Sequence, residues 1–169
     1  MNMSNALKRV LVCGFPGTGK SWFKDQSPDA INVDLGMYVY DSDSSNFSWL
    51  NTDPEQPKVR NPAFPSNYMD YIQDINYGLI FISTHAVVRE ALANRTNKFI
   101  IVYPDISLKE EYIQRYINRG SPDSFITLMN DKWDEWITEL DELDHPYKIK
   151  LTQGQYIKDI AQDIVNFQF

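Results

Sequence analysis

The chain has 169 residues, which suits one compact domain, and its composition is 43% hydrophobic and 14% aromatic, enough for a sizeable core. Its net charge of -7 disfavours tight non-specific binding to nucleic acid, which normally requires a basic surface. The sequence contains no run of about 18 apolar residues, so we expect no membrane span. Cys13 is the only cysteine, which excludes an internal disulfide. With no apolar signal-peptide stretch near the N-terminus, this favours a cytoplasmic location.

Apolar runs bounded by turn residues predict the strands of a sheet. The expected strands are residues 10–12, 37–40, 79–82, 99–103 and 147–151. Helical apolar spacing and capping patterns predict the helices between them; one such pattern is the capping box Ser107-x-x-Glu110. The expected helices open at residue 21 and cover residues 67–77, 87–93, 107–118, 124–143 and 155–165. The proline-rich residues 42–65 are expected to form a loop.

Strands that alternate with helices predict an α/β fold with a parallel sheet. The strands are apolar without alternation, as in a sheet that helices cover on both faces. We therefore expect a three-layer α/β/α architecture in a single domain of residues 1–169.

One segment matches the pattern G-x-x-x-x-G-K-[ST] in full. Its eight residues are Gly14, Phe15, Pro16, Gly17, Thr18, Gly19, Lys20 and Ser21. In such a P-loop, or Walker A motif, glycines let backbone N–H groups converge on phosphate oxygens, the lysine reaches the β- and γ-phosphates, and the serine hydroxyl binds Mg²⁺. The match follows an expected strand and opens an expected helix, which is the context the motif requires. The sequence therefore predicts a site for a nucleoside triphosphate, with ATP and Mg²⁺ as the expected ligands.

A carboxylate near the γ-phosphate is the next group that phosphoryl transfer needs. Asp41 lies at the C-terminal edge of the second expected strand, followed by Asp43, and ligands of open α/β sheets bind off such edges. Asp34 lies closer to Lys20 and leaves little room for a crossover, which needs about a dozen residues or more. We expect Asp41 or Asp43 to be catalytic, with Asp41 also at the metal, and keep Asp34 as the alternative. The other interpretation of residues 41–45 is a simple polar loop.

Arg115 and Arg119 are four residues apart and therefore share one face of a helix. They follow the fourth expected strand, in a lid-like segment of about residues 108–121 that includes Gly120. Two guanidinium groups placed there would clamp phosphate oxygens and stabilise the charge that spreads during transfer. The alternative is a solvated face on which Glu111 pairs with Arg115.

Arg89 and Arg60 are the candidates for binding a phosphate acceptor. Arg89 lies just past the third strand and would hold an acceptor phosphate, whereas the nearby His85 is interpreted as an ordinary strand-end histidine. Arg60 lies among prolines and aromatic residues in an acceptor-side loop of about residues 42–68, which would cover a base by stacking. The alternative for this loop is a packed connection. The tryptophans of helix 124–143 are interpreted as core.

Four segments together resemble a known group of proteins. Residues 14–21, 41–49, 61–68 and 111–120 look like P-loop nucleoside and nucleotide kinases, and most closely like small kinase-like proteins of bacteriophages and their hosts. The resemblance implies a nucleoside monophosphate kinase-like fold, with five parallel strands in the order 2-3-1-4-5 and an arginine-bearing lid. For a phage protein it implies the host cytoplasm. The acceptor motif of adenylate kinases is not found after the third strand, so the resemblance implies phosphoryl transfer without naming the acceptor.

The leading hypothesis is therefore an ATP-dependent kinase that acts on a small nucleoside or nucleotide. A second hypothesis is a kinase for a hydroxyl of nucleic acid or a modified base, because polynucleotide kinases resemble the opening motif; the acidic charge makes this partner less favoured. A third is a nucleotide-binding regulatory module with little turnover. The third expected strand does not end in an acid, which disfavours motor ATPases and GTPases.

Overall fold

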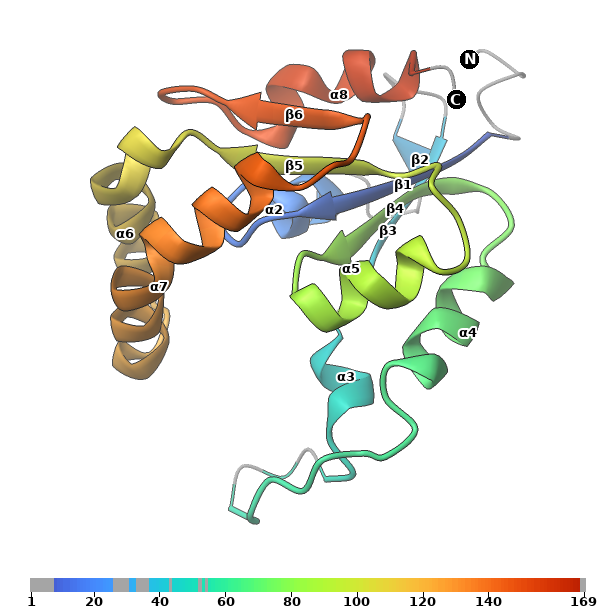
Figure 1. Ribbon diagram of the computed structural model, residues 1–169, viewed down its shortest axis with the longest axis horizontal. Coiled ribbons are helices and arrows are strands. Elements are labelled where there is room, and N and C mark those ends of the chain that lie inside the picture. The colour runs from blue at the N-terminus through green and yellow to red at the C-terminus, as the bar shows by residue number, and fades with distance from the viewer. Residues whose placement is uncertain are drawn as a thin grey trace.

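The computed structural model describes residues 8–25, 31–32, 37–42, 44–51, 53 and 55–167 (Figure 1). The strands are β1 (Arg9–Gly14), β2 (Ile31–Asn32), β3 (Met37–Asp41), β4 (Gly78–Ser83), β5 (Ile100–Pro104) and β6 (Lys148–Leu151). The helices are α2 (Lys20–Asp25), α3 (Ser45–Ser48), α4 (Ser66–Asp74), α5 (Ala86–Ala93), α6 (Lys109–Asn118), α7 (Asp123–Glu142) and α8 (Ile157–Val165). A short 3₁₀ turn, η1 (Ile106–Leu108), precedes α6.

Five of these strands form the parallel sheet expected from the sequence. Their spatial order is β3-β4-β1-β5-β6, which is 2-3-1-4-5 when the parallel strands are counted along the chain. A sixth, two-residue strand, β2, pairs antiparallel with β3 at the sheet edge and was not expected. Because β1 lies between β4 and β5, the loop that follows Gly14 leaves the middle of the sheet.

Helices cover both faces of the sheet, so the three-layer architecture is confirmed (Figure 1). Alternate strand residues enter two separate cores. Leu11 of β1 packs with residues of α4, α5, α6 and α7, whereas Val10 and Val12 pack with residues of α2 and α8. Cys13 is fully buried in the first core, and burial raises the pKa of its thiol to about 12, so it packs as a small apolar side chain.

Two local expectations are wrong. Residues 42–65 are not all loop, because α3 forms at Ser45–Ser48. The capping box at Ser107 does not form: Asp105 caps η1 instead, its carboxylate accepting hydrogen bonds from the backbone N–H and hydroxyl of Ser107. Asp105 precedes the pattern by only two residues, and a carboxylate competes well for free N–H groups at a helix start. Over the ranges given above, none of the helices is both long and apolar enough to span a bilayer.

Candidate functional site

The predicted phosphate loop joins the end of β1 to the start of α2. Gly17 and Gly19 have φ angles of 89° and 95°, a region that side-chain-bearing residues rarely adopt. A Cβ atom on Gly17 would also lie 2.9 Å from the Tyr116 ring, and one on Gly19 would lie 3.1 Å from the Tyr156 ring. Both glycines are therefore required by backbone conformation and by close packing against aromatic side chains.

Neighbouring parts of the chain hold three carbonyl groups of this loop. Pro16 O accepts from the Tyr116 hydroxyl at 2.7 Å, Gly17 O from Arg115 Nη1 at 2.9 Å, and Thr18 O from the Ile157 N–H at 2.8 Å. In a trans peptide the N–H points opposite to the carbonyl. The N–H groups of Gly17 and Gly19 therefore face away from these partners, on the side of the loop where an anion can bind.

The side chains of Ser21 and Asp41 form a hydrogen-bonded pair beside the loop. Asp41 ends β3 and its backbone pairs with Phe81 of β4, which brings its side chain to the carboxyl edge of the sheet. The Ser21 hydroxyl donates to Asp41 Oδ2 at 2.9 Å, and both residues are exposed. Hydroxyl and carboxylate oxygens suit Mg²⁺, which is usually bound by one or two protein groups together with phosphate and water.

A metal site built from side chains alone usually gathers three or more ligands. Among the described residues, no three His, Cys, Asp or Glu side chains come together as a ligand set. Two protein oxygens, as at Ser21 and Asp41, would suit a metal that arrives with a nucleotide. Asp34 and Asp43, the other candidate acids, lie outside the described residues.

A cavity of about 810 Å³, here called the P-loop cavity, opens over this pair. It is lined by Pro16, Gly17, Gly19, Lys20, Ser21, Trp22, Asp25, Asp41, Ser42, Ser44, Ser83, His85, Arg115, Asn118, Arg119, Phe125 and Tyr156. It contains most of the predicted loop, the predicted acid and both predicted lid arginines. The topology thus brings together groups that are far apart in the sequence.

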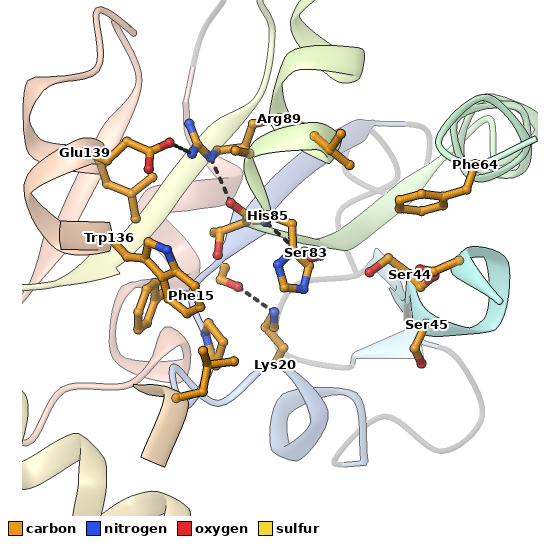
Figure 2. Close-up of a pocket in the computed structure, with 18 of the residues that line it drawn as sticks. Phe15, Lys20, Ser44, Ser45, Phe64, Ser83, His85, Arg89, Trp136 and Glu139 are labelled. Carbon is orange, nitrogen blue, oxygen red and sulfur yellow. Dashed lines mark hydrogen bonds and ion pairs between the residues drawn. The ribbon is translucent and has the colours of Figure 1, made fainter. Parts of the chain in front are cut away.

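A second cavity, here called the Trp136 cavity, has a volume of about 680 Å³ (Figure 2). It is lined by Gly14, Phe15, Pro16, Lys20, Ser44, Ser45, Ser48, Trp49, Arg60, Phe64, Ser83, Thr84, His85, Ala86, Val87, Arg89, Leu128, Trp136, Glu139 and Leu140. In Figure 2 Trp136 and Phe64 stand on opposite sides of it, with His85 between them. Its size lies within the usual range for small-molecule sites, about 300–1,000 Å³.

The two cavities meet at Lys20. They share Pro16, Lys20, Ser44, Ser83 and His85. Lys20 Nζ donates to Gly14 O at 2.5 Å within the loop. A group bound in either cavity can therefore approach the same ammonium group.

Arg115 joins α6 to the phosphate loop. Besides Gly17 O, its guanidinium contacts Glu111 Oε2 and Gln155 O, each at 3.0 Å, and its side chain is only 10% exposed. The guanidinium also lies over the Tyr156 ring, 3.8 Å from the centroid. The pairing with Glu111 that the sequence left as an alternative is present. The same arginine also lines the P-loop cavity.

Arg119 is placed differently from Arg115. It is exposed, its Nε donates to the Ser121 hydroxyl at 2.9 Å, and its guanidinium lies over the rings of Tyr116 and Phe125. Arg119 has fewer bonds to break than Arg115 if it turns toward a ligand. Whether residues 108–121 act as a lid stays a prediction.

Two tyrosines of α6 pack against the loop. Tyr112 and Tyr116 are fully buried, and burial raises the pKa of Tyr112 to about 12 and the pKa of Tyr116 above its ordinary value. Both hydroxyls therefore stay protonated at neutral pH, and Tyr116 can act as a constant donor to Pro16 O.

Arg89 and Arg60 both line the Trp136 cavity, but their guanidinium groups are engaged. Arg89 is 6% exposed, donates through Nε to Thr84 O at 2.8 Å and pairs with Glu139 Oε1 at 2.5 Å. Arg60 is exposed, and its guanidinium lies 4.6 Å from the centroid of the Trp49 ring. Both arginines line one cavity, but binding of an acceptor by either of them stays a prediction. The pairing of Arg89 with a carboxylate was not expected.

Three of the residues that line these cavities were not identified from the sequence. Trp136 was assigned to the core with Trp133; Trp133 is fully buried, but Trp136 is half-buried and lines a cavity. Glu139, on the same helix, and Tyr156, just before α8, were not considered. For Tyr156 a signal existed, since it follows a glycine-containing turn after the last strand. Nothing local marks Glu139.

No family model matches the chain, and no curated protein sequence is significantly similar to it.

Proposed function

We propose that this protein transfers the γ-phosphoryl group of ATP to a small nucleoside or nucleotide. The observation that carries the proposal is the meeting of the two cavities at Lys20. A phosphoryl-transfer enzyme must hold donor and acceptor in line on either side of the transferred group, because most of its catalysis is positioning and charge stabilisation. The P-loop cavity suits the donor triphosphate, and the Trp136 cavity suits the acceptor.

The donor is held by the backbone N–H groups of the loop and by Lys20. The inward amides of Gly17 and Gly19 would bind phosphate oxygens, and Lys20 Nζ would exchange Gly14 O for the β- and γ-phosphates. Magnesium, when bound with ATP, neutralises charge on the β- and γ-phosphates, and Ser21 with Asp41 would supply its protein oxygens.

The acceptor is activated by a carboxylate. Asp41 Oδ2 is bonded to Ser21, so the second oxygen, Oδ1, is the proposed proton acceptor. The acceptor oxygen bonds to the γ-phosphorus while the bond from that phosphorus to the β–γ bridging oxygen breaks. ADP leaves with that electron pair. For a hydroxyl acceptor, the proton passes to Asp41. Arg119 would add positive charge beside the transferred group.

The source of the carboxylate also favours a kinase over a motor ATPase. β4, the strand beside β1, ends at Ser83, and the acid next to Ser21 comes from β3 instead. This separates the candidate proton acceptor from the strand on which a Walker B acid would be sought.

The test is a phosphoryl-transfer screen with ATP labelled at the γ-phosphate. The acceptors are nucleosides, nucleoside monophosphates and DNA with a 5′-hydroxyl, each with Mg²⁺, and the Lys20→Ala variant is the control. Labelled nucleoside or nucleotide product from the wild type alone supports the proposal. Labelled DNA would replace it with a polynucleotide kinase activity. ATP binding without any labelled product would replace it with a regulatory module.

A further inference from the structure

The walls of the Trp136 cavity carry one carboxylate in a place where an anionic acceptor would need positive charge. We infer that, within the proposed transfer reaction on which this rests, the acceptor is an uncharged nucleoside that reacts through a hydroxyl, rather than a nucleoside monophosphate. The transfer step is the hydroxyl reaction written above, with the proton passing to Asp41 and ADP leaving.

The first argument is the state of Arg89. Bidentate contact with a phosphate requires a guanidinium with two free N–H groups on one edge. Arg89 already directs Nε to Thr84 O and Nη2 to Glu139, and only 8% of its side chain is exposed. Its positive charge is neutralised within the wall, so it offers little attraction to a second anion.

The second argument is Glu139 itself. Oε1 contacts Arg89, the side chain remains 45% exposed, and Glu139 lines the cavity. A dianionic monophosphate beside it would meet the negative end of an ion pair that has no net positive charge to offer. The N–H groups on the edge of a nucleobase are suitable donors to the same carboxylate. Glu139 therefore selects a neutral, N–H-bearing ring over an anion.

The other cations on this cavity do not reverse that preference. Arg60 is exposed and stacks on Trp49 at the outer wall. Lys20 belongs to both cavities and is assigned to the transferred phosphoryl group. Among the described lining residues, therefore, no buried arginine remains for an acceptor phosphate.

The third argument is the shape and composition of the wall. Trp136 and Phe64 face the cavity from opposite sides (Figure 2), which suits stacking of a planar base. Glu139 lies on the Trp136 side, and Ser44 and Ser45 lie on the Phe64 side, with Lys20 apart from both (Figure 2). The base would lie toward Glu139, and the serine hydroxyls suit a sugar whose own hydroxyl is directed to Lys20.

The experiment compares each nucleoside with its own 5′-monophosphate, using the full chain with ATP and Mg²⁺. Transfer is followed as labelled product, and binding of both acceptors is measured by calorimetry. In the wild type, kcat/KM and affinity should favour the nucleoside by about tenfold or more, because the phosphate would face a carboxylate whose partner arginine is already engaged. In Glu139→Gln, that ratio should fall by about tenfold, while ATP affinity stays unchanged.

Two further variants keep the result interpretable. Glu135 lies on the same helix, pairs with Lys132 and does not line the cavity. The Glu135→Gln variant should therefore keep the wild-type ratio. Trp136→Leu removes stacking area without touching the Arg89 pair, and should weaken nucleoside binding by about tenfold. The Trp136→Leu variant still tests nucleoside binding in this cavity if Glu139→Gln does not fold.

The outcomes separate this inference from the proposed function. Nucleoside binding that is favoured over monophosphate binding, without transfer, would support the inference and refute the proposed function. A wild-type preference for monophosphates, binding of neither acceptor, or an unchanged ratio in Glu139→Gln would overturn the inference. Transfer to monophosphates would leave the proposed function standing.

Discussion

The Ser21 hydroxyl donates a hydrogen bond of 2.9 Å to the Asp41 carboxylate, across 20 positions of sequence. The two residues belong to different elements: Ser21 lies in the first turn of α2, and Asp41 is the last residue of β3. The β3-β4-β1 order puts the ends of these parallel strands on the same edge of the sheet. The fold itself therefore builds an oxygen pair beside the phosphate loop.

The first prediction concerns the role of Asp41. Asp41→Asn should lower kcat by about 10²- to 10⁴-fold, because it removes the proposed proton acceptor. ATP affinity should fall much less than kcat, because proton transfer belongs to the transition state and the asparagine keeps one oxygen for the metal. Asp25→Asn is the matched control, since Asp25 lines the same cavity at the end of α2. Equal loss in both variants would mean that only the cavity's charge matters.

The second prediction concerns the glycines of the loop. Gly17→Ala should lower both stability and ATP affinity, because its φ of 89° is unfavourable and the new Cβ would meet Tyr116 at 2.9 Å. Gly154→Ala is the control: its φ is 74°, but a Cβ there meets nothing within 4 Å. The control should lose about 1 kcal/mol of unfolding free energy, and Gly17→Ala about 1–3 kcal/mol more.

Urea unfolding and ATP titration of the two glycine variants provide the measurement. Only Gly17→Ala should bind ATP more weakly. If Gly154→Ala were as destabilised as Gly17→Ala, the contact with Tyr116 would have no energetic importance.

The sequence was sufficient for the features that depend on local patterns. The alternation of apolar runs and helical segments predicts the five parallel strands, and the glycine-rich motif predicts the strand-loop-helix at Gly14 to Ser21. The position of Asp41 followed from a general rule, that ligands bind off strand ends in α/β sheets. No knowledge of packing was needed for either.

Contacts between distant segments could not be predicted. Glu139 reaches Arg89, 50 positions away in the sequence, only because the fold brings α7 near α5. From the sequence, Arg115 was predicted to be a lid arginine, with a solvated face paired to Glu111 as the alternative. Neither interpretation includes its bond to Gly17 O, which spans 98 positions. A sequence pattern records neither the neighbour of a helix face nor which of its residues border a cavity.

The third prediction concerns acid stability. The Asp141 carboxylate accepts a hydrogen bond from the Tyr103 hydroxyl at 2.7 Å and contacts Lys150 Nζ at 2.9 Å. These groups lower the pKa of Asp141 in the folded protein from the ordinary 3.8. A lowered folded pKa means that the stabilisation is present above the unfolded value and is lost as pH falls through the folded value.

Asp141→Asn should therefore destabilise the protein at pH 7 by a few tenths of a kcal/mol, because the pair is largely exposed. The difference from wild type should shrink below the unfolded pKa of about 4. Urea unfolding at several pH values measures it, with Asp134→Asn on the exposed face of the same helix as control. A difference that grows on acidification would show that the sign is wrong.

The fourth prediction separates the two arginines of α6. Arg119→Ala should lower transfer by about ten- to a thousandfold, because it removes charge beside the transferred group. ATP affinity and thermal stability should stay near wild type, because the Arg119 side chain is exposed and bonded only locally among the described contacts. Arg115→Ala should behave differently. Its guanidinium holds Gly17 O and Gln155 O from a position that is 10% exposed.

Removing Arg115 leaves these half-buried carbonyl groups without that donor and should cost about 2 kcal/mol. For a chain of this length, the melting temperature would fall by about 4–8 °C. ATP affinity should fall as well, because the loop loses one of the bonds that turn its N–H groups inward.

Arg95→Ala, which removes an exposed pair with Asp70, should change neither quantity and is the control. Thermal melts with and without ATP, beside steady-state kinetics, distinguish the two roles. An Arg115→Ala variant with wild-type stability and ATP affinity but reduced transfer would make Arg115 a lid residue after all, as its position in the sequence suggested.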